Sequence, residues 1–373
     1  MRKITLWVLL FALALSALPH SAAQEPDLFQ PVRSMELEYA TGFQVDYDDA
    51  GRKLITLLDG SQFLVLPPDG KVPENAPAGA AVLRQPISNI YLAATSAMCL
   101  FDALDRLDAI SLSGSRAESW YIENARLAME EGRIRYAGKY SEPDYELLLG
   151  SRCSLAVESM MIGHASDVKK KLEELGIPVL TDQSSMEEHP LGRTEWMKLY
   201  AALLNEEEKA ERLFREQTAF LEETVGMEIP PKTVAFFYIS SSGRVVARKS
   251  GDYVTKMLEL AGGDYVFRDL GDPQTRTSTV TIEMEQFFAS AKDAEVLIYN
   301  STIGGEIRTM EELLEKSPLL SQFRAVQTGN VWCTQKNMYQ ETTQLGQMIQ
   351  SFRKVFSGEA EGLNELPFLY RLS

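Results

Sequence analysis

Residues 87–113, ISNIYLAATSAMCLFDALDRLDAISLS, contain the pattern that decides the fold. Ile87 to Ala93 is a mostly apolar run that predicts a strand, Ser96 to Leu107 has a helical composition, and Ala109 to Ser113 predicts a second strand. A strand, a helix and a strand in this order are typical of a βαβ unit, in which the strands are parallel and the helix covers the sheet. The sequence therefore predicts an α/β fold.

The same alternation continues along the chain. In the first half, a helix over 143–150, a strand over 154–158, a helix over 165–175 and a strand over 176–180 are expected. In the second half, the expected elements are a strand at 234–239, a helix at 253–261, a helix at 281–291, a strand at 295–299, a helix at 310–314 and a strand at 330–334. These patterns predict two parallel-sheet lobes that mirror each other.

A long helical segment separates the two patterns. Residues 193–226 carry apolar side chains at helical spacing, including Trp196 and Leu199 on one stripe and Phe214 on another. Asn205 followed by Glu208 resembles a capping box and marks a break between two helices. A helix of this length predicts a rigid connection with little room for a large hinge motion.

The N-terminal part has a different composition. Arg2 and Lys3 precede an apolar run and small residues at 21–23, which predicts a secretory signal cleaved after Ala23; an uncleaved anchor is the alternative. Residues 36–66 alternate apolar and polar positions between turn compositions and predict a small β-meander, followed by a Pro- and Gly-rich linker. The expected division is 1–23 signal peptide, 24–83 meander and linker, 84–188 first lobe, 189–228 connecting helix and 229–373 second lobe.

Charge and residue counts exclude several classes of function. The formal net charge of −16 disfavours a nucleic-acid partner, whose phosphates would be repelled. Three cysteines leave room for one disulfide at most and build no disulfide framework. Only His164 and His189 lie beyond the signal, which excludes a multi-histidine metal site and disfavours a metal-ion binding protein.

Residues 84–357 resemble the periplasmic binding proteins that deliver ferric siderophores, haem and cobalamin to ABC importers. The most specific segment is PDYELLLGSRCSLAV at 143–157, which follows the family's helix-then-strand pattern but has Cys153 and Ser154 where Pro-Asp is usual. LGIPV at 175–179, HPLGRTEW at 189–196 and MLELAGG at 257–263 add to the likeness. The resemblance implies two Rossmann-like lobes of parallel sheet flanked by helices, joined by a long rigid helix and here preceded by the meander.

The resemblance also implies how such a protein meets its permease. One glutamate on each lobe contacts arginines of the membrane protein, and the matching positions are Glu146 and Glu285. Two exposed carboxylates at opposite ends would orient the protein through charge complementarity. The alternative is that both are ordinary charges on helix surfaces.

Ligands of two-lobed α/β proteins bind beyond the carboxyl ends of the strands. The loops expected there carry arginines, which bind carboxylate, catecholate or phosphate oxygens, beside aromatic and methionine side chains that contact a broad ligand. The candidate ligand-binding residues are Arg116, Trp120, Met160, His164, Arg193, Arg244, Arg248 and Tyr339.

Each of these residues also has a structural interpretation. Trp196 lies on the apolar stripe of its helix and fits the core better than the cleft, and Arg193 fits a capping role equally well. Arg244 and Arg248 are compatible with solvated strand charges. His164 as an axial ligand of haem or cobalt is a weaker interpretation, because a single loop histidine is more often structural or solvent-facing, and Tyr253 as a ligand of haem iron is weaker still.

The sequence therefore predicts an exported, monomeric solute-binding subunit of an ABC importer for a ferric siderophore, with a corrinoid and then haem as alternatives. No catalytic residue, cofactor or metal site is expected. A secreted enzyme is the rival class, but no Gly-x-Ser-x-Gly nucleophile elbow occurs. A coiled-coil module is disfavoured because the glutamate-rich helix at 206–223 is interrupted and lies among βα units.

Overall fold

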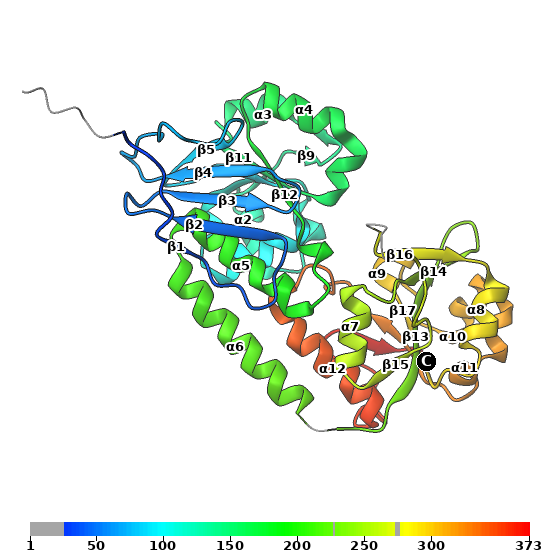
Figure 1. Ribbon diagram of the computed structural model, residues 1–373. Helices are drawn as coiled ribbons and strands as arrows, with labels where there is room; N and C mark the ends of the chain where they lie inside the picture. The colour runs from blue at the N-terminus through cyan, green and yellow to red at the C-terminus, as the bar shows by residue number, and fades with distance from the viewer. Residues whose placement is uncertain (1–25, 227, 273–276) are drawn as a thin grey trace, which may run out of the picture.

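The computed structural model describes residues 26–226, 228–272 and 277–373. Two α/β lobes lie side by side, and a further sheet covers the first of them (Figure 1). The expected signal peptide, residues 1–23, lies outside the described residues. Of the helices within the described ranges, none has the length and apolar character needed to cross a membrane.

The N-terminal sheet contains the expected meander. It consists of β1 (Arg33–Ser34), β2 (Phe43–Tyr47), β3 (Lys53–Leu57), β4 (Gln62–Leu66) and β5 (Ala81–Arg84), in that order. The first four strands are antiparallel neighbours, while β5 returns to pair with β4 in parallel. Val45, Ile55 and Val65 are fully buried and share one core with the first lobe. The alternation of the sequence therefore marks a sheet that packs on the lobe through one face.

The first lobe has a five-stranded parallel sheet in the order β12-β11-β6-β7-β8. Its strands are β6 (Ile90–Leu92), β7 (Ile110–Ser113), β8 (Arg135–Tyr136), β11 (Leu155–Ser159) and β12 (Val179–Asp182), and β9 (Gly138–Lys139) with β10 (Glu142–Pro143) forms a small hairpin. Its helices are α1 (Met98–Ala103), α2 (Glu123–Glu130), α3 (Tyr145–Gly150) and α4 (Ser166–Glu174). The helix expected over 96–107 is shorter, because the chain turns at Asp105, which has a φ of 55°.

Two helices follow the first lobe. These are α5 (Pro190–Leu204), in which every residue is buried, and the amphipathic α6 (Glu207–Val225). The break expected near Asn205 is present, but the capping box with Glu208 is wrong. Asn205 ends α5 in the left-handed region with a φ of 60°, and its side-chain oxygen accepts hydrogen bonds from Lys53 and Gln85 instead of capping α6.

The second lobe has a mixed sheet, so it does not mirror the first. Its strands are β13 (Lys232–Ile239), β14 (Val245–Arg248), β15 (Gly263–Tyr265), β16 (Thr279–Ile282), β17 (Val296–Tyr299), β18 (Val331–Thr334) and β19 (Leu369–Arg371). β13, β15, β17 and β18 are parallel, whereas β14, β16 and β19 are antiparallel to their neighbours. Two predictions are wrong as a result: residues 245–248 form a strand instead of a cleft loop, and the helix expected from 281 begins at Met284, after β16.

The helices of the second lobe are α7 (Tyr253–Leu260), α8 (Met284–Ala291), α9 (Ser301–Gly304), α10 (Met310–Lys316), α11 (Arg324–Gln327) and α12 (Leu345–Ser357). The sequence reading left α12 unassigned, although Leu345, Met348, Ile349, Phe352 and Phe356 are buried at helical spacing. This helix packs against both α6 and α7. Leu191 of α5 and Phe214 of α6 also belong to the core of the second lobe, so the two lobes share packed elements.

The three cysteines, all within the described ranges, are buried and form no disulfide. The disulfide that the sequence left open is therefore not formed.

Candidate ligand site between the lobes

A buried polar cluster lies at the carboxyl end of β14 in the second lobe. The Arg248 guanidinium lies 3.4 Å from the Asp252 carboxylate and donates a 2.6 Å hydrogen bond to the Tyr339 hydroxyl. Asn300, directly after β17, donates to the same hydroxyl at 2.8 Å. Burial raises the pKa of Asp252, and the nearby Arg248 offsets this effect only in part. In this cluster the buried Arg248 cation is therefore surrounded by groups that follow the ends of three strands, β14, β17 and β18.

Arg193 of α5 reaches the second lobe beside this cluster. Its guanidinium carbon lies 3.8 Å from the centroid of the Tyr253 ring, at the start of α7. Such a cation–π contact stabilises a guanidinium that has left water. On the same helix, Thr194 donates a 3.0 Å hydrogen bond to the carbonyl oxygen of Thr342. The first two turns of α5 are thus in direct contact with the second lobe.

A second connection between the lobes runs through Gln340. Its side-chain oxygen accepts a 2.9 Å hydrogen bond from the backbone N–H of Tyr121, and its amide nitrogen donates to the carbonyl oxygen of Ser119. Trp120 lies between these two residues and is 3 % exposed. The junction between the lobes is therefore formed by backbone groups of the β7–α2 connection, by side chains of α5 and by the segment after β18.

Three polar atoms at this junction are buried without a hydrogen-bond partner among the described residues. They are Trp120 Nε1, Arg193 Nε and Asn337 Oδ1, one each from the first lobe, α5 and the second lobe. Buried polar groups in proteins nearly always have partners, and an unpaired one costs about 1–3 kcal/mol. Two of the three atoms are N–H donors.

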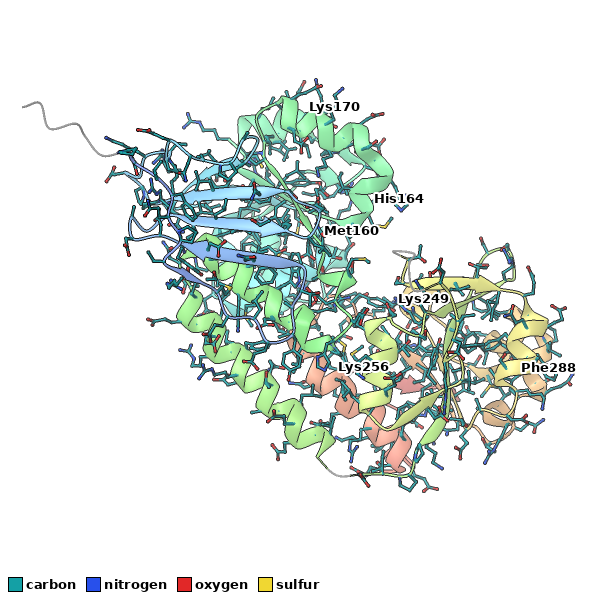
Figure 2. All side chains as sticks on the ribbon, viewed as in Figure 1. Met160, His164, Lys170, Lys249, Lys256 and Phe288 are labelled. Atoms are coloured by element: carbon teal, nitrogen blue, oxygen red, sulfur yellow. The ribbon has the colours of Figure 1, made fainter. Side chains whose placement is uncertain are left out.

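Two cavities border the junction. One, of about 200 Å³, is lined by Glu187 and Glu188 of the first lobe and by Lys249, Asp252 and Tyr253 of the second. The other, of about 370 Å³, lies between Tyr121 and the segments 306–308, 335–337 and 365–370. Figure 2 shows Met160 and His164 on the edge of the first lobe that faces the second, with Lys249 on the opposing edge.

The structure brings only part of the predicted site together. Arg193, Arg248 and Tyr339 lie at the junction in the contacts described above, and Trp120 lies beside them with its Nε1 unpaired among the described residues. Arg116 is exposed, and its guanidinium lies 4.3 Å from the Tyr136 ring centroid. Met160 is half-buried and His164 is exposed, on the edge of the first lobe that faces the second. Arg244 lies in the β13–β14 hairpin turn and forms an ion pair with Glu283 at 2.8 Å, apart from the buried cluster.

The residues considered as structural alternatives are also placed. Trp196 is fully buried and donates a 2.8 Å hydrogen bond to Glu187, as expected for a core residue. Tyr253 is buried beneath Arg193, which leaves its hydroxyl little access to a haem iron. Within the described ranges, no group of three or more His, Cys, Asp or Glu side chains could hold a metal ion.

Glu146 and Glu285 occupy equivalent local positions. Each is exposed and is the second residue of a helix, α3 in the first lobe and α8 in the second. Figure 1 shows α3 on the first lobe and α8 on the outer side of the second lobe. In α3 the side chain of Asp144 accepts a hydrogen bond from the Leu147 N–H, which fixes the start of the helix.

Sequence reasoning missed Asp252, Asn300 and Gln340. Asn300 could have been found, because it directly follows a buried strand. Asp252 was hidden because β14 had not been recognised as a strand. Gln340 has no sequence signal, since its role depends on backbone groups of the other lobe.

This arrangement defines a class of two-lobed α/β proteins with a candidate ligand site at the lobe junction. The family model described as periplasmic binding protein matches residues 121–338, more than half of the chain. The chain belongs to the periplasmic binding protein family, whose members bind solutes, and the resemblance seen in the sequence is confirmed.

Relatives and solved structures agree with this membership. An uncharacterized lipoprotein of Methanocaldococcus jannaschii is 28 % identical over 295 residues, 75 % of this chain and 68 % of the relative. A second one is 23 % identical over 353 residues, 90 % and 86 % of the two chains. A periplasmic binding protein from Veillonella parvula shares the fold with a TM-score of 0.61 and 15 % identity, covering 85 % of this chain and 98 % of that one. A periplasmic heme binding protein from Pseudomonas aeruginosa has a TM-score of 0.60 and 16 % identity, with 77 % and 98 % covered.

Proposed function

We propose that the protein is the exported solute-binding subunit of an ABC importer, which captures an iron(III) chelate of the siderophore type between its lobes. The observation that carries this proposal is the set of unpaired buried polar atoms at the junction, of which Trp120 Nε1 and Arg193 Nε are donors. Such donors suit the carboxylate, catecholate or hydroxamate oxygens of an anionic chelate.

The sizes of the two cavities and the residues of the nearby loops also support a bulky ligand. The cavity between Glu187 and Asp252 measures about 200 Å³, below the roughly 300–1,000 Å³ of pockets for drug-sized ligands, and the cavity beside Tyr121 measures about 370 Å³. A chelate that fills the smaller cavity would also contact the loops that follow the first-lobe strands, which carry Arg116 after β7 and Met160 after β11. Among similar folds is a possible iron-binding, periplasmic solute-binding protein from Staphylococcus epidermidis, at a TM-score of 0.56. Export accords with the two relatives named as lipoproteins.

The test is a titration of the purified protein with a ferric siderophore, haem and cobalamin, followed by tryptophan fluorescence. Arg116→Ala should weaken binding of the ferric siderophore by about tenfold, roughly 1.4 kcal/mol, because a charge-assisted contact from the loop after β7 is lost. Arg215→Ala is the matched control, since this arginine is exposed on α6 and pairs only with Glu211 in the described structure. Equal affinities in both variants would contradict a ligand site that includes Arg116.

Glu146 and Glu285 are proposed to contact arginines of the permease. Their support is their exposure at the first turns of helices on the two lobes. Glu146→Lys combined with Glu285→Lys should abolish uptake by cells that carry the importer, while the ligand affinity of the isolated protein stays unchanged. Glu216→Lys on the exposed face of α6 is the control, and uptake that survives the double reversal would refute the docking role.

A further inference from the structure

The loop before β2 is bound by a buried carboxylate of α5. The backbone N–H groups of Tyr39 and Ala40 each donate a 2.8 Å hydrogen bond to Glu195, and the N–H of Glu38 donates to the same carboxylate at 3.0 Å. Glu195 is fully buried, and Lys198 supplies its counter-charge at 2.9 Å. A buried carboxylate that receives this many donors is well compensated for its lost hydration.

A second buried carboxylate continues the same row of donors. Glu187 lies between β12 and α5 and accepts hydrogen bonds from the N–H of Thr41 at 3.0 Å and of Gly42 at 2.9 Å. The Thr41 hydroxyl and Trp196 Nε1 donate to the same carboxylate at 3.1 and 2.8 Å. Five consecutive backbone N–H groups, from residue 38 to 42, therefore bind two carboxylates of another part of the chain.

The loop before β2 is closely packed against α5 and the residues that precede it. A Cβ atom added to Gly42 would lie 2.8 Å from the Trp196 ring and 2.9 Å from Glu187 Oε1. Tyr39 stacks on His189 at a centroid distance of 4.5 Å. Close approach at Gly42 and stacking at Tyr39 hold the loop against the start of α5.

The C-terminal end of α5 is held by the same sheet. Lys53 of β3 donates 2.7 Å hydrogen bonds to the Ala202 carbonyl oxygen and to the Asn205 side chain. Gln85, directly after β5, donates a 3.0 Å bond to the Leu203 carbonyl oxygen. These carbonyl groups at the end of a helix lack partners within the helix, so the bonds satisfy them. The N-terminal sheet thus binds α5 along its whole length.

The residues held in this way form one wall of the lobe junction. Glu187 lines the cavity between the lobes opposite Asp252. Arg193, two residues before Glu195, stacks on Tyr253 of the second lobe. A shift of α5 would therefore move the junction contacts directly.

We propose that the N-terminal sheet is a brace that fixes α5, and that Glu187 and Glu195 are the positioning residues that transmit this support to the junction. The sheet holds Glu187 and Glu195, and α5 holds Arg193 and Thr194 against the second lobe. This role goes beyond solute binding and is the same for any ligand.

The test is hydrogen exchange of backbone amides in the full-length mature protein without ligand. Glu187→Gln should raise the exchange rates of residues 248–253 and 337–344 at least tenfold, while residues 296–299 in the centre of the second-lobe sheet keep their protection. Arg52→Met is the matched control, because Arg52 binds Asp48, Asp27 and the Leu28 carbonyl oxygen, which all lie within the N-terminal part. It should loosen residues 27–52 and leave the junction unchanged.

Faster exchange at residues 38–42 in Glu187→Gln, with unchanged rates at 248–253 and 337–344, would overturn the proposal. If Glu187→Gln does not fold, Thr41→Val removes only the hydroxyl bond to Glu187 and should give a smaller rise at the same junction segments; no rise would again overturn it. Because the measurement contains no ligand, its outcome is independent of whether a ferric chelate binds.

Discussion

The burial of the Glu158 carboxyl, near the end of β11, leads us to predict a specific dependence of stability on pH. Its side chain is fully buried, and neither carboxyl oxygen has a hydrogen-bond partner among the described residues. Burial raises the pKa of Glu158 from 4.5 to about 8. Tyr91 and Tyr145 are the neighbouring titratable groups, and the negative form of Glu158 would raise the pKa of both. At neutral pH the carboxyl is thus held in its protonated form.

The sign of the effect follows from proton binding. Between pH 4.5 and 8 the folded state keeps a proton that the unfolded state releases, so stability falls as pH rises through this window and levels off above it. Each pKa unit corresponds to 1.36 kcal/mol, so the whole window amounts to about 5 kcal/mol, with a slope of up to about 1.4 kcal/mol per pH unit. The Glu158→Gln variant lacks this titration.

The assay is urea unfolding of the wild type and of Glu158→Gln at pH 5, 6, 7 and 8, followed by circular dichroism. The free energy of unfolding of the variant relative to the wild type should increase steadily with pH. A constant offset of about 1–3 kcal/mol is expected in addition, because the buried amide also lacks partners. Glu146→Gln, which changes an exposed carboxyl of the same lobe, is the control. A difference between Glu158→Gln and the wild type that does not vary with pH would refute the reasoning.

Two further substitutions test the buried contacts. Arg248→Met leaves the buried Asp252 carboxylate without its ion-pair partner and should lower the free energy of unfolding by about 3–5 kcal/mol, as measured by urea unfolding; a loss below about 1 kcal/mol would show that the pair is not needed. Gly42→Ala places a methyl group 2.8 Å from the Trp196 ring and should cost about 1–3 kcal/mol, with a changed near-ultraviolet circular dichroism spectrum of that tryptophan. An unchanged spectrum and stability would contradict the close packing of this loop on α5.

Four strands of the first lobe, β6, β7, β11 and β12, and the central strands of the second could be predicted from the sequence, whereas β8 and the β9–β10 hairpin were not predicted. Buried parallel strands such as β11 and β17 appear as short apolar runs between helical segments, which is a strong local signal. β14 and β16 were missed because they lie in the antiparallel part of the sheet and are bordered by charged or polar residues. The helix predicted from 281 began too early because the apolar spacing of α8 continues back into β16.

The candidate site was predictable only in part. Arg193 and Tyr339 carry the chemistry expected of a ligand site, and both lie at the lobe junction. The ion pair between Arg248 and Asp252 could be predicted only if β14 had been recognised as a strand. The roles of Glu187 and Glu195 could not be predicted, because their partners are backbone N–H groups of a distant loop, which carry no side-chain signal.

The most direct test of a solute-binding role is native mass spectrometry of residues 24–373 after incubation with an equimolar mixture of a ferric siderophore, haem and cobalamin. We expect a single one-to-one adduct with the mass of the ferric siderophore, which is reduced in Arg116→Ala and retained in Arg215→Ala. A one-to-one adduct with haem or cobalamin would leave solute binding intact and contradict the proposed ligand. No adduct with any of the three, from protein shown to be folded, would contradict capture of an iron chelate or corrinoid between the lobes.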